Sequence, residues 1–251
     1  KEPVINLRAS NVVQWWLYYP GTIATNELAL DATQRQVLGP SLQAYAAGDL
    51  RAALRAYPTN RKPANDSEHI YRAALRLVVG DTLGTRQTLG QLNRTSSPAR
   101  ALEIMIAAVT FQLPQTEPQP ETASEWLAYS YLLQARHDLT NALNAAQNAV
   151  AFAPTFGYAH ERVAELQFGH GRIKEADAAL AKALEFSPRN AQARALQGFI
   201  RAAENHIEEA LSEFGKAIEL DPTLANGWLG RGLCRMRTND VSGGLTDLAT
   251  A

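Results

Sequence analysis

Small and hydrophobic residues recur at a constant interval in the second half of the chain. The same spacing separates Pro154 from Pro188 and Pro188 from Pro222, and the residues between these prolines keep the same register. Alanine lies five and twelve positions before each proline, at Ala149, Ala183 and Ala217 and at Ala142, Ala176 and Ala210. Such small side chains let two helices approach closely. The period therefore predicts a stack of repeated, closely packed helical hairpins.

Each repeat is expected to consist of a helix, a turn and a second helix. Residues that end helices or tolerate unusual backbone angles lie in the middle of each unit, as His137-Asp138, Gly171-Arg172, Asn205-His206 and Asn239-Asp240. The next residue is aliphatic in every unit, at Leu139, Ile173, Ile207 and Val241, and is expected to open the second helix and lie in the core. The first helices carry a further small column at Ser130, Ala164, Gly198 and Gly232.

These columns divide the end of the chain into four regular units. Their predicted bounds are 123–156, 157–190, 191–224 and a truncated 225–251. Thr122 and Glu125 match a capping box, in which each side chain bonds to the backbone N–H of the other residue. This motif predicts that the first unit begins directly after Thr122.

Residues 41–122 are predicted to hold degenerate hairpins of the same kind. The turn pairs Gly48-Asp49 and Gly80-Asp81 are slightly closer together than one full repeat, so the period drifts in this region. A helix is expected over 99–113, and it lacks a partner helix because the next segment, 114–120, holds three prolines and cannot continue a helix. A shortened or deleted second helix is the simplest interpretation.

Residues 1–40 differ from the rest and are predicted to form an irregular capping or linker segment. Trp15, Trp16, Tyr18 and Tyr19 lie close together there, and aromatic residues at this density need burial. One interpretation is a cap laid over the apolar end of the repeats. The alternative is an anchor at a membrane interface, which the small number of basic residues in the segment makes the weaker hypothesis.

The recurring small, aromatic, alanine and proline positions resemble the tetratricopeptide repeat, whose period is about 34 residues. Trp126 and Trp228 match the tryptophan of its first helix, Gly198 and Gly232 match its glycine, and Phe214 matches its second-helix aromatic. The resemblance implies an all-α fold, a right-handed superhelical α-solenoid of helix-turn-helix repeats. Gln197 and Arg231 depart from the pattern, because they replace the expected leucine.

A second resemblance involves the N-terminal part of the chain. The string VVQWWLYYP, followed by GDLRAAL, YRAAL and YSYLLQARHDL, is similar to bacterial proteins in which a FecR-like domain precedes tetratricopeptide repeats. This resemblance implies a piece of a larger exported protein of the bacterial periplasm or cell envelope.

Composition and charge exclude some classes of partner but do not identify the partner. The chain has 24 Lys and Arg against 25 Asp and Glu, so it is not the polycation expected for binding nucleic acid or an anionic membrane. No apolar run reaches the length of about 18 residues that indicates a membrane helix, and no transmembrane segment is predicted. We therefore expect a protein or peptide partner rather than a nucleic acid.

No set of residues predicts a catalytic, metal or cofactor site. His160 begins a pattern similar to that of zinc proteases, but the second ligand position is Ala164. Gly227, Gly230 and Gly232 lack the spacing of a dinucleotide-binding loop and are interpreted as helix-packing glycines. Cys234 lies on an apolar column and is interpreted as a small buried residue. The prediction is that the protein is not an enzyme.

A solenoid of this kind predicts binding along its concave face, which the first helices line. By the resemblance, the groove would be lined by Leu127, Tyr131, Gln134, Glu161, Glu165, Phe168, Ala195, Phe199, Ala202, Leu229, Leu233 and Met236. This mostly apolar surface suits an amphipathic helix or hydrophobic peptide, with Tyr131, Phe168 and Phe199 as anchors. These anchors could instead be covered by the chain's own N-terminal or proline-rich segment.

Two further functions belong to other classes. The fourth unit ends inside its second helix, so the uncapped apolar surface near Leu245 and Leu248 suggests self-association, as in a structural array or an oligomerisation module. An enzyme is the weakest alternative because no residue set supports it. A non-catalytic scaffold for a protein or peptide partner is the preferred prediction.

Overall fold

The computed structural model describes residues 21–92 and 96–251, and this part of the chain is helical throughout, without a β-strand. Its N-terminal elements are the 3-10 helix η1 (Thr25–Glu27) and the α-helices α2 (Ala32–Val37), α3 (Gly39–Ala46), α4 (Leu50–Ala56), α5 (Asp66–Val78), α6 (Thr82–Leu89) and α7 (Ser97–Val109). The later helices are α8 (Ala123–Ala135), α9 (Leu139–Phe152), α10 (Gly157–Gly169), α11 (Ile173–Phe186), α12 (Ala191–Ala203), α13 (Ile207–Leu220), α14 (Ala225–Arg237) and α15 (Val241–Thr250). The prediction of an all-α solenoid is confirmed.

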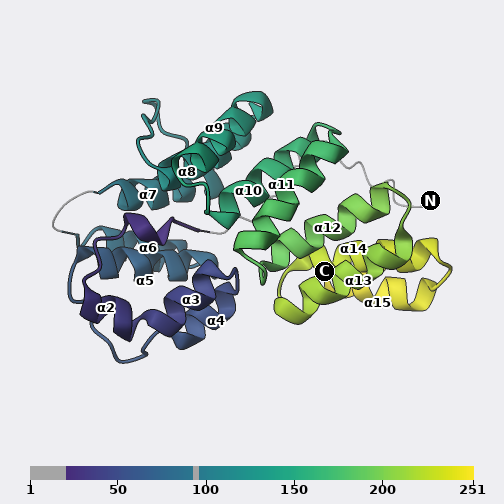
Figure 1. The fold of residues 1–251 in the computed structure, drawn as a ribbon, viewed down its shortest axis with the longest axis horizontal. Coiled ribbons are helices and arrows are strands. Elements are labelled where there is room, and N and C mark those ends of the chain that lie inside the picture. The colour runs from purple at the N-terminus through teal and green to yellow at the C-terminus, as the bar shows by residue number, and fades with distance from the viewer. Residues whose placement is uncertain (1–20, 93–95) are drawn as a thin grey trace, which may run out of the picture.

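The later helices form four hairpins that follow the predicted period. Each first helix has 13 residues, and each second helix has 14 except the shorter α15. The turn inside each hairpin contains one residue in the left-handed region, at His137, Gly171, Asn205 and Asn239. Figure 1 shows these hairpins side by side, from α8 and α9 at the top to α14 and α15 at the right.

The start of α8 differs in detail from the predicted capping box. The Thr122 hydroxyl accepts a hydrogen bond from the Glu125 N–H, as expected. The Glu125 carboxylate, however, does not return to the Thr122 N–H, because it accepts from the Glu121 N–H and from the Arg100 guanidinium. The box is therefore only half formed, and its glutamate links α8 to α7 instead.

The aliphatic column also differs from the prediction in its burial. Leu139, Ile173, Ile207 and Val241 each open a second helix, but the first three are only half-buried and Val241 is exposed. They lie at the hairpin tips, where a helix end cannot be surrounded on all sides. The alanine columns at the crossings are fully buried instead.

Earlier hairpins form at the degenerate repeats. Helices α3 and α4 meet at Gly48, which has a φ of +94°, and α5 and α6 meet at Gly80, which has a φ of +79°. In each case the following aspartate caps the second helix, because Asp49 accepts from the Ala52 N–H and Asp81 accepts from the Gly84 N–H. The turn chemistry of these units is thus the same as in the regular ones, although the period is not.

Helix α7 is the first helix of a unit that has no second helix. It spans Ser97–Val109 rather than the predicted 99–113, and Phe111 then adopts the left-handed turn conformation with a φ of +53°. The chain does not enter a helix after this turn, because prolines follow from Pro114 onward. The proline-rich segment lies against α8, where Glu117 binds the Tyr129 hydroxyl and the Arg136 guanidinium.

The α3–α4 turn docks on the turn between the second and third regular units. The Arg189 N–H donates to the Ala47 carbonyl at 2.7 Å, and the Ser187 hydroxyl donates to the Ala46 carbonyl at 2.8 Å. The Arg189 guanidinium also pairs with Asp49 at 2.8 Å. The N-terminal hairpins therefore pack against the side of the repeats, as Figure 1 shows for α3 and α4 beside α10 to α13.

The start of the described chain is bound to the same region. The Ala24 N–H donates to the Ser124 hydroxyl at 2.8 Å, and the Glu27 carboxylate accepts from the Ser124 N–H at 3.1 Å. The described part of the predicted cap thus contacts the beginning of α8 through Ala24 and through Glu27 of η1. Its four clustered aromatic residues lie outside the described residues.

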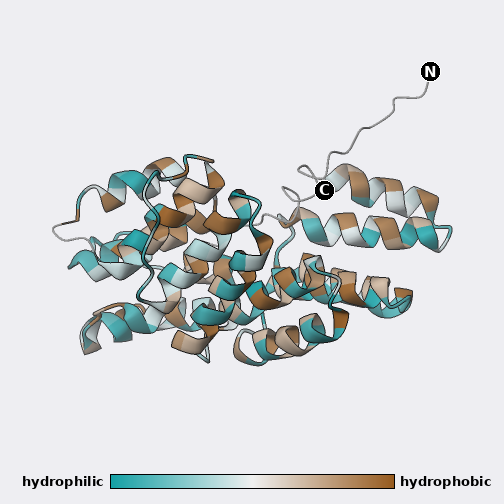
Figure 2. Cartoon of the chain, turned by 90° about the horizontal axis from the view of Figure 1, so that it is seen from above, coloured by the Kyte–Doolittle hydropathy of each residue, from teal (hydrophilic) through white to brown (hydrophobic). Residues whose placement is uncertain are grey.

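Hydrophobic residues alternate with polar ones along each helix (Figure 2). The largest core cluster joins helices α3 to α9 with the start of α10, and includes Leu38, Tyr71, Met105 and Leu127. Smaller clusters lie between the successive hairpins further along the chain. The first regular unit therefore belongs to the core of the N-terminal half as well as to the stack of repeats.

Candidate functional site

Helices α8, α10, α12 and α14 lie next to one another and carry the predicted groove residues at the same register. Equivalent positions are one repeat apart, so Leu127, Glu161, Ala195 and Leu229 form one row; Tyr131, Glu165, Phe199 and Leu233 form a second; and Gln134, Phe168, Ala202 and Met236 form a third. The structure brings these residues onto one surface of the stack, but their burial changes strongly along it.

The part of this surface on α8 is covered. Leu127 and Tyr131 are buried in the large core cluster, together with residues of α5 and α7. Gln134 is also buried, and its Oε1 atom has no hydrogen-bond partner among the residues that the structure describes. An incoming peptide therefore cannot reach the α8 surface without displacing what covers it.

A buried ionic cluster lies on α10. The Arg162 guanidinium is fully buried, pairs with Glu165 at 2.7 Å and donates to the Ser130 hydroxyl at 3.0 Å. It also lies over the ring of Tyr131, with 3.9 Å between Cζ and the ring centroid, which is a cation–π contact. One guanidinium thus joins α8 and α10 through both polar and aromatic contacts.

The two carboxylates on α10 are in an unfavourable environment. Burial raises the pKa of Glu161 well above its ordinary value, and the neighbouring charge of Glu165 raises it further. Burial raises the pKa of Glu165 as well, although Arg162 opposes that rise. Among the described residues the Arg162 guanidinium pairs with Glu165 and not with Glu161, so this part of the groove holds more carboxyl groups than it pairs.

The surface opens over α12 and α14. Phe168 and Phe199 are half-buried, and Phe199 packs edge-on against Phe214 with 4.9 Å between the ring centroids. Leu229 is also half-buried, while Leu233 is 51% exposed and Met236 is 39% exposed. These side chains give an accessible apolar surface at the groove positions of the last two units.

Arg162 and Ser130 organise the covered part of the groove, although no role was predicted for Arg162 and only a packing role for Ser130. The signal was present in the charge pattern, because Glu161, Arg162 and Glu165 lie close together on a helix that packs on both sides. Charged residues at such a position have to be paired or bound by a ligand. Of these three charged residues, only Glu161 and Glu165 were predicted to line the groove.

Other candidate chemical groups lie in ordinary environments. The His160 ring is hydrogen-bonded to the Pro154 carbonyl at 2.8 Å. Cys234 is buried, and burial raises the pKa of its thiol, which disfavours the reactive thiolate. The described residues hold no group of three His, Cys, Asp or Glu side chains that could bind a metal ion.

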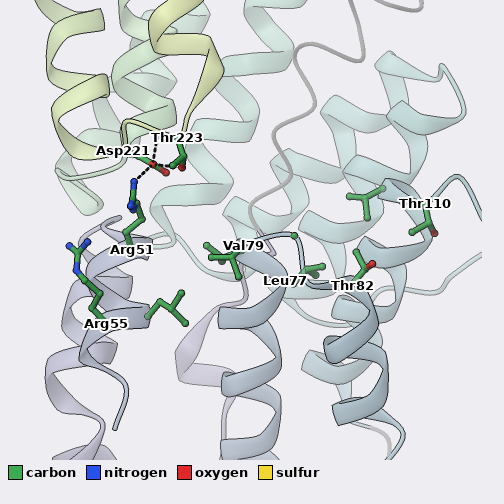
Figure 3. Close-up of a pocket in the computed structure, with 12 residues that line it drawn as sticks. Arg51, Arg55, Leu77, Val79, Thr82, Thr110, Asp221 and Thr223 are labelled. Carbon is green, nitrogen blue, oxygen red and sulfur yellow. Dashed lines mark hydrogen bonds and ion pairs between the residues drawn. The ribbon is translucent and has the colours of Figure 1, made fainter. Parts of the chain in front are cut away.

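A second hollow of about 890 Å³ lies between the N-terminal hairpins and the repeats (Figure 3). Arg51 of α4 pairs with Asp221 of the α13–α14 turn at 3.1 Å on one side of it. Leu77, Val79 and Thr110 line the other side. None of the predicted groove residues lines this hollow, and its hydroxyls, aliphatic groups and paired charges do not form a catalytic set.

The comparisons with known proteins give similarities of fold. No protein-family model matches the sequence, and no curated protein matches it. Among solved structures, the chain is similar to MamA with 13% identity and a TM-score of 0.45, over 71% of this chain and 91% of that chain. It is similar to PilF of Pseudomonas aeruginosa with 13% identity and a TM-score of 0.47, over 74% of each chain.

A third solved structure is that of YrrB, described as a TPR protein with an unusual peptide-binding site. It has 17% identity and a TM-score of 0.42, over 82% of this chain and 91% of that chain. Identities and scores at this level carry no functional argument. The described residues form tetratricopeptide-like repeats on their own geometry, and nothing found supports the resemblance to FecR-domain proteins.

Crossing a bilayer requires a helix that is both long and strongly hydrophobic. None of the helices within residues 21–92 and 96–251 combines these two properties.

Proposed function

We propose that the protein is a non-catalytic scaffold that binds a peptide or a helix of a protein partner along the groove side of α12 and α14. The observation that carries this proposal is the exposed apolar surface of α14. Leu229, Leu233 and Met236 are spaced by four and three positions and therefore lie on one face of the helix. An amphipathic helix or apolar peptide would bury this face.

The neighbouring helix extends the proposed surface. Phe199 on α12 holds the same register position as Leu233, and its ring packs against the buried Phe214. A rigid aromatic ring of this kind is a typical anchor at an interface.

A selection from phage-displayed random peptides, followed by calorimetry with the selected peptide, tests this function. Leu233→Asp is expected to weaken binding by about tenfold or more, because the charge would be buried under the ligand. Leu245→Asp is the matched control, since Leu245 is another exposed leucine but lies on α15. Equal affinities for both variants and the unmodified chain would rule out the groove.

Self-association is the second candidate function. Val241 is 51% exposed and Leu245 is 56% exposed on α15, so the last hairpin presents its own apolar face. Sedimentation velocity over a range of concentrations is expected to show a dimer that Leu245→Asp abolishes and Leu233→Asp preserves. The same two variants therefore distinguish the two functions. A location in the bacterial envelope stays a prediction from the sequence resemblance.

A further inference from the structure

Helix α9 differs from α11 and α13 because none of its 14 residues is charged. At two exposed register positions α11 and α13 carry a glutamate and a lysine, as Glu175 with Lys182 and Glu209 with Lys216. The same positions in α9 are Asn141 and Asn148, and Asn144 lies between them on the same face. Asparagine is a poorer helix former than glutamate or lysine, so helix stability does not explain these three residues.

This face of α9 opens into a hollow of about 470 Å³. Its walls are formed by α9, by α8 and by the proline-rich segment, which contribute Asn141, Asn144 and Asn148, Trp126 and Leu133, and Glu117. We call it the asparagine hollow. Figure 1 shows the proline-rich segment on the opposite side of α9 from α11, so the hollow faces away from the later repeats.

The hollow lies on the side of α8 where the other units have a helix. Helices α10, α12 and α14 each pack against the second helix of the preceding unit. Helix α8 has no such neighbour, because residues 110–122 between α7 and α8 contain no helix. Val163 of α10 packs against a cluster that includes Leu143 and Ala146 of α9, whereas Tyr129, its counterpart in α8, lines the hollow.

A non-helical stretch of the chain already lies along one wall. The Arg136 guanidinium donates to the Pro114 carbonyl at 3.0 Å and binds the Glu117 carboxylate. The same carboxylate accepts from the Tyr129 hydroxyl. These contacts occupy the charged and phenolic groups of α8, so the asparagines of α9 are the polar groups that the hollow still offers.

Two of these asparagines are unused. The side chains of Asn144 and Asn148 have no hydrogen-bond partner among the residues that the structure describes. The Asn141 amide donates to Asp138 at 2.7 Å and keeps its own acceptor oxygen. Each primary amide offers one acceptor and two donors, and so matches both the N–H and the C=O of a peptide backbone.

The spacing of the amides also fits an extended chain. Asn144 and Asn148 are four residues apart, which is about 6 Å along the helix axis. Two residues of an extended chain cover about 6.6 Å. Successive asparagines can therefore meet alternate backbone groups, which point to the same side of the chain.

The charges of the hollow describe what fits beside these amides. Its cation, Arg136, is paired with Glu117, and Asp138 accepts from the Asn141 N–H as the cap of α9. A charged ligand would thus lose water without finding a free partner of opposite charge. Trp126 adds an aromatic surface on which an apolar side chain can pack.

We infer that the asparagine hollow binds an uncharged, extended segment of a partner protein. The backbone of this segment pairs with Asn144 and Asn148, and its apolar side chains pack on Trp126. The site is separate from the groove side of α12 and α14. It therefore goes beyond the proposed function and adds a second binding surface on another face of the repeats.

Fluorescence anisotropy with the full chain and the fluorescein-labelled peptide GSVTNVSVTG tests the inference. This peptide is uncharged, favours an extended backbone and has an N–H at every residue, and one sequence suffices because backbone contacts tolerate many side chains. Two further peptides carry N-methyl groups on alternate residues, one in each register. At least one of them is expected to bind about tenfold more weakly or worse, because the backbone donors that face the asparagines are lost.

Variants of α9 locate the binding. Asn144→Ala combined with Asn148→Ala should weaken binding of GSVTNVSVTG by about tenfold or more, and alanine keeps the helix intact. Gln147→Ala is the matched control, because Gln147 is an exposed amide of the same helix that does not line the hollow. Leu233→Asp should leave this affinity unchanged, so the groove and the hollow can fail separately.

Nuclear magnetic resonance supplies a second measurement. The side-chain amide signals of Asn144 and Asn148, assigned through the single variants, are expected to shift when GSVTNVSVTG is added, whereas that of Gln147 stays in place. Equal affinities for the plain and both N-methylated peptides would overturn the inference, as would no binding of the plain peptide at about 1 mM. Binding of chitohexaose instead, with the same dependence on the asparagines, would assign the hollow to a carbohydrate and also overturn it.

Discussion

Gly48 and Gly80 hold equivalent turn positions, but only one of them is also constrained by a tertiary contact. Both have a positive φ, which side chains other than glycine adopt at a cost. A Cβ added to Gly48 would lie 2.5 Å from the backbone nitrogen of Asn190, whereas one added to Gly80 would meet nothing within 4 Å. The glycine at 48 therefore serves both the hairpin and its docking on the repeats.

We predict that Gly80→Ala lowers the free energy of unfolding by about 1–2 kcal/mol, the cost of the left-handed conformation. Gly48→Ala is expected to cost about 1–3 kcal/mol more, because the turn must also move away from Asn190. Urea denaturation followed by circular dichroism measures both values. Equal losses for the two variants would mean that the docking of the α3–α4 turn contributes nothing to stability.

The buried Glu161 predicts a dependence of stability on pH. Its pKa is raised in the folded state, so between the ordinary value near 4.5 and the folded value the folded chain holds one proton more than the unfolded chain. Stability then falls as the pH rises through that window. The groups that face Glu161 are Glu165, which strengthens this effect, and Arg162, which weakens it.

Glu161→Gln should remove that loss. We expect the variant to be more stable than the unmodified chain by on the order of 1 kcal/mol at about pH 7.5 and about equally stable at about pH 4. Urea denaturation at the two pH values measures the difference. Glu185→Gln is the control, because Glu185 is exposed and, among the described residues, forms its ion pair with the exposed Lys182 in the same helix. A gain in stability that is independent of pH would contradict the assignment.

At the scale of single helices, the sequence specified most of the regular half. The recurrent alanines, prolines and turn residues lie where the structure has helix crossings and hairpin turns, because each depends on a local requirement for small size or backbone freedom. The first residue of each second helix was also placed correctly, at Leu139, Ile173, Ile207 and Val241. The burial of these residues was not predicted correctly, because the hydrophobicity of a side chain at a helix tip does not determine how many neighbours surround that side chain.

The packing role assigned to the glycines of α14 is confirmed. Gly230 and Gly198 both face the ring of the fully buried Phe214, and Gly232 lies against the Gly244 carbonyl. Two helices therefore approach one phenylalanine from opposite hairpins, and each does so through a residue without a side chain. Gly215, in the middle of α13, has open space around the position of a Cβ.

Gly230→Ala and Gly215→Ala are expected to have opposite effects. The first would overlap the fully buried Phe214 ring and should destabilise the chain by about 1–3 kcal/mol. The second places a better helix former at an unconstrained position and should stabilise it by up to about 1 kcal/mol. Thermal unfolding of the two variants tests this, and a stable Gly230→Ala would show that α12, α13 and α14 are loosely packed.

At the scale of the whole molecule, the contacts that join the two halves were not predictable from the sequence. Asp49 and Arg189 are 140 residues apart in the sequence. Asp49 is already accounted for as the cap of a helix and Arg189 as a turn residue, so neither residue indicates a distant partner. The covering of Leu127 and Tyr131 has the same cause, because the missing partner of α7 leaves α8 to pack against the N-terminal helices. Periodicity describes a repeat and its neighbours, and it contains no information about elements that return to the stack from outside.

The contact between the α3–α4 turn and residues 187–190 predicts how the N-terminal hairpins separate from the repeats. Arg189 is 58% exposed on its side chain while Asp49 is 6% exposed, so Arg189→Ala removes little packing but leaves a covered carboxylate without its cation. The loss of global stability should be small, about 1 kcal/mol.

Hydrogen exchange of the Arg189→Ala variant is expected to show faster deuterium uptake at both the α3–α4 turn and residues 187–190, because the two turns protect each other. Lys182→Ala breaks an exposed pair within α11 and should change exchange only locally. If Arg189→Ala accelerated exchange at one turn alone, the two halves would open independently, and the N-terminal hairpins could not hold the covered side of the groove in place.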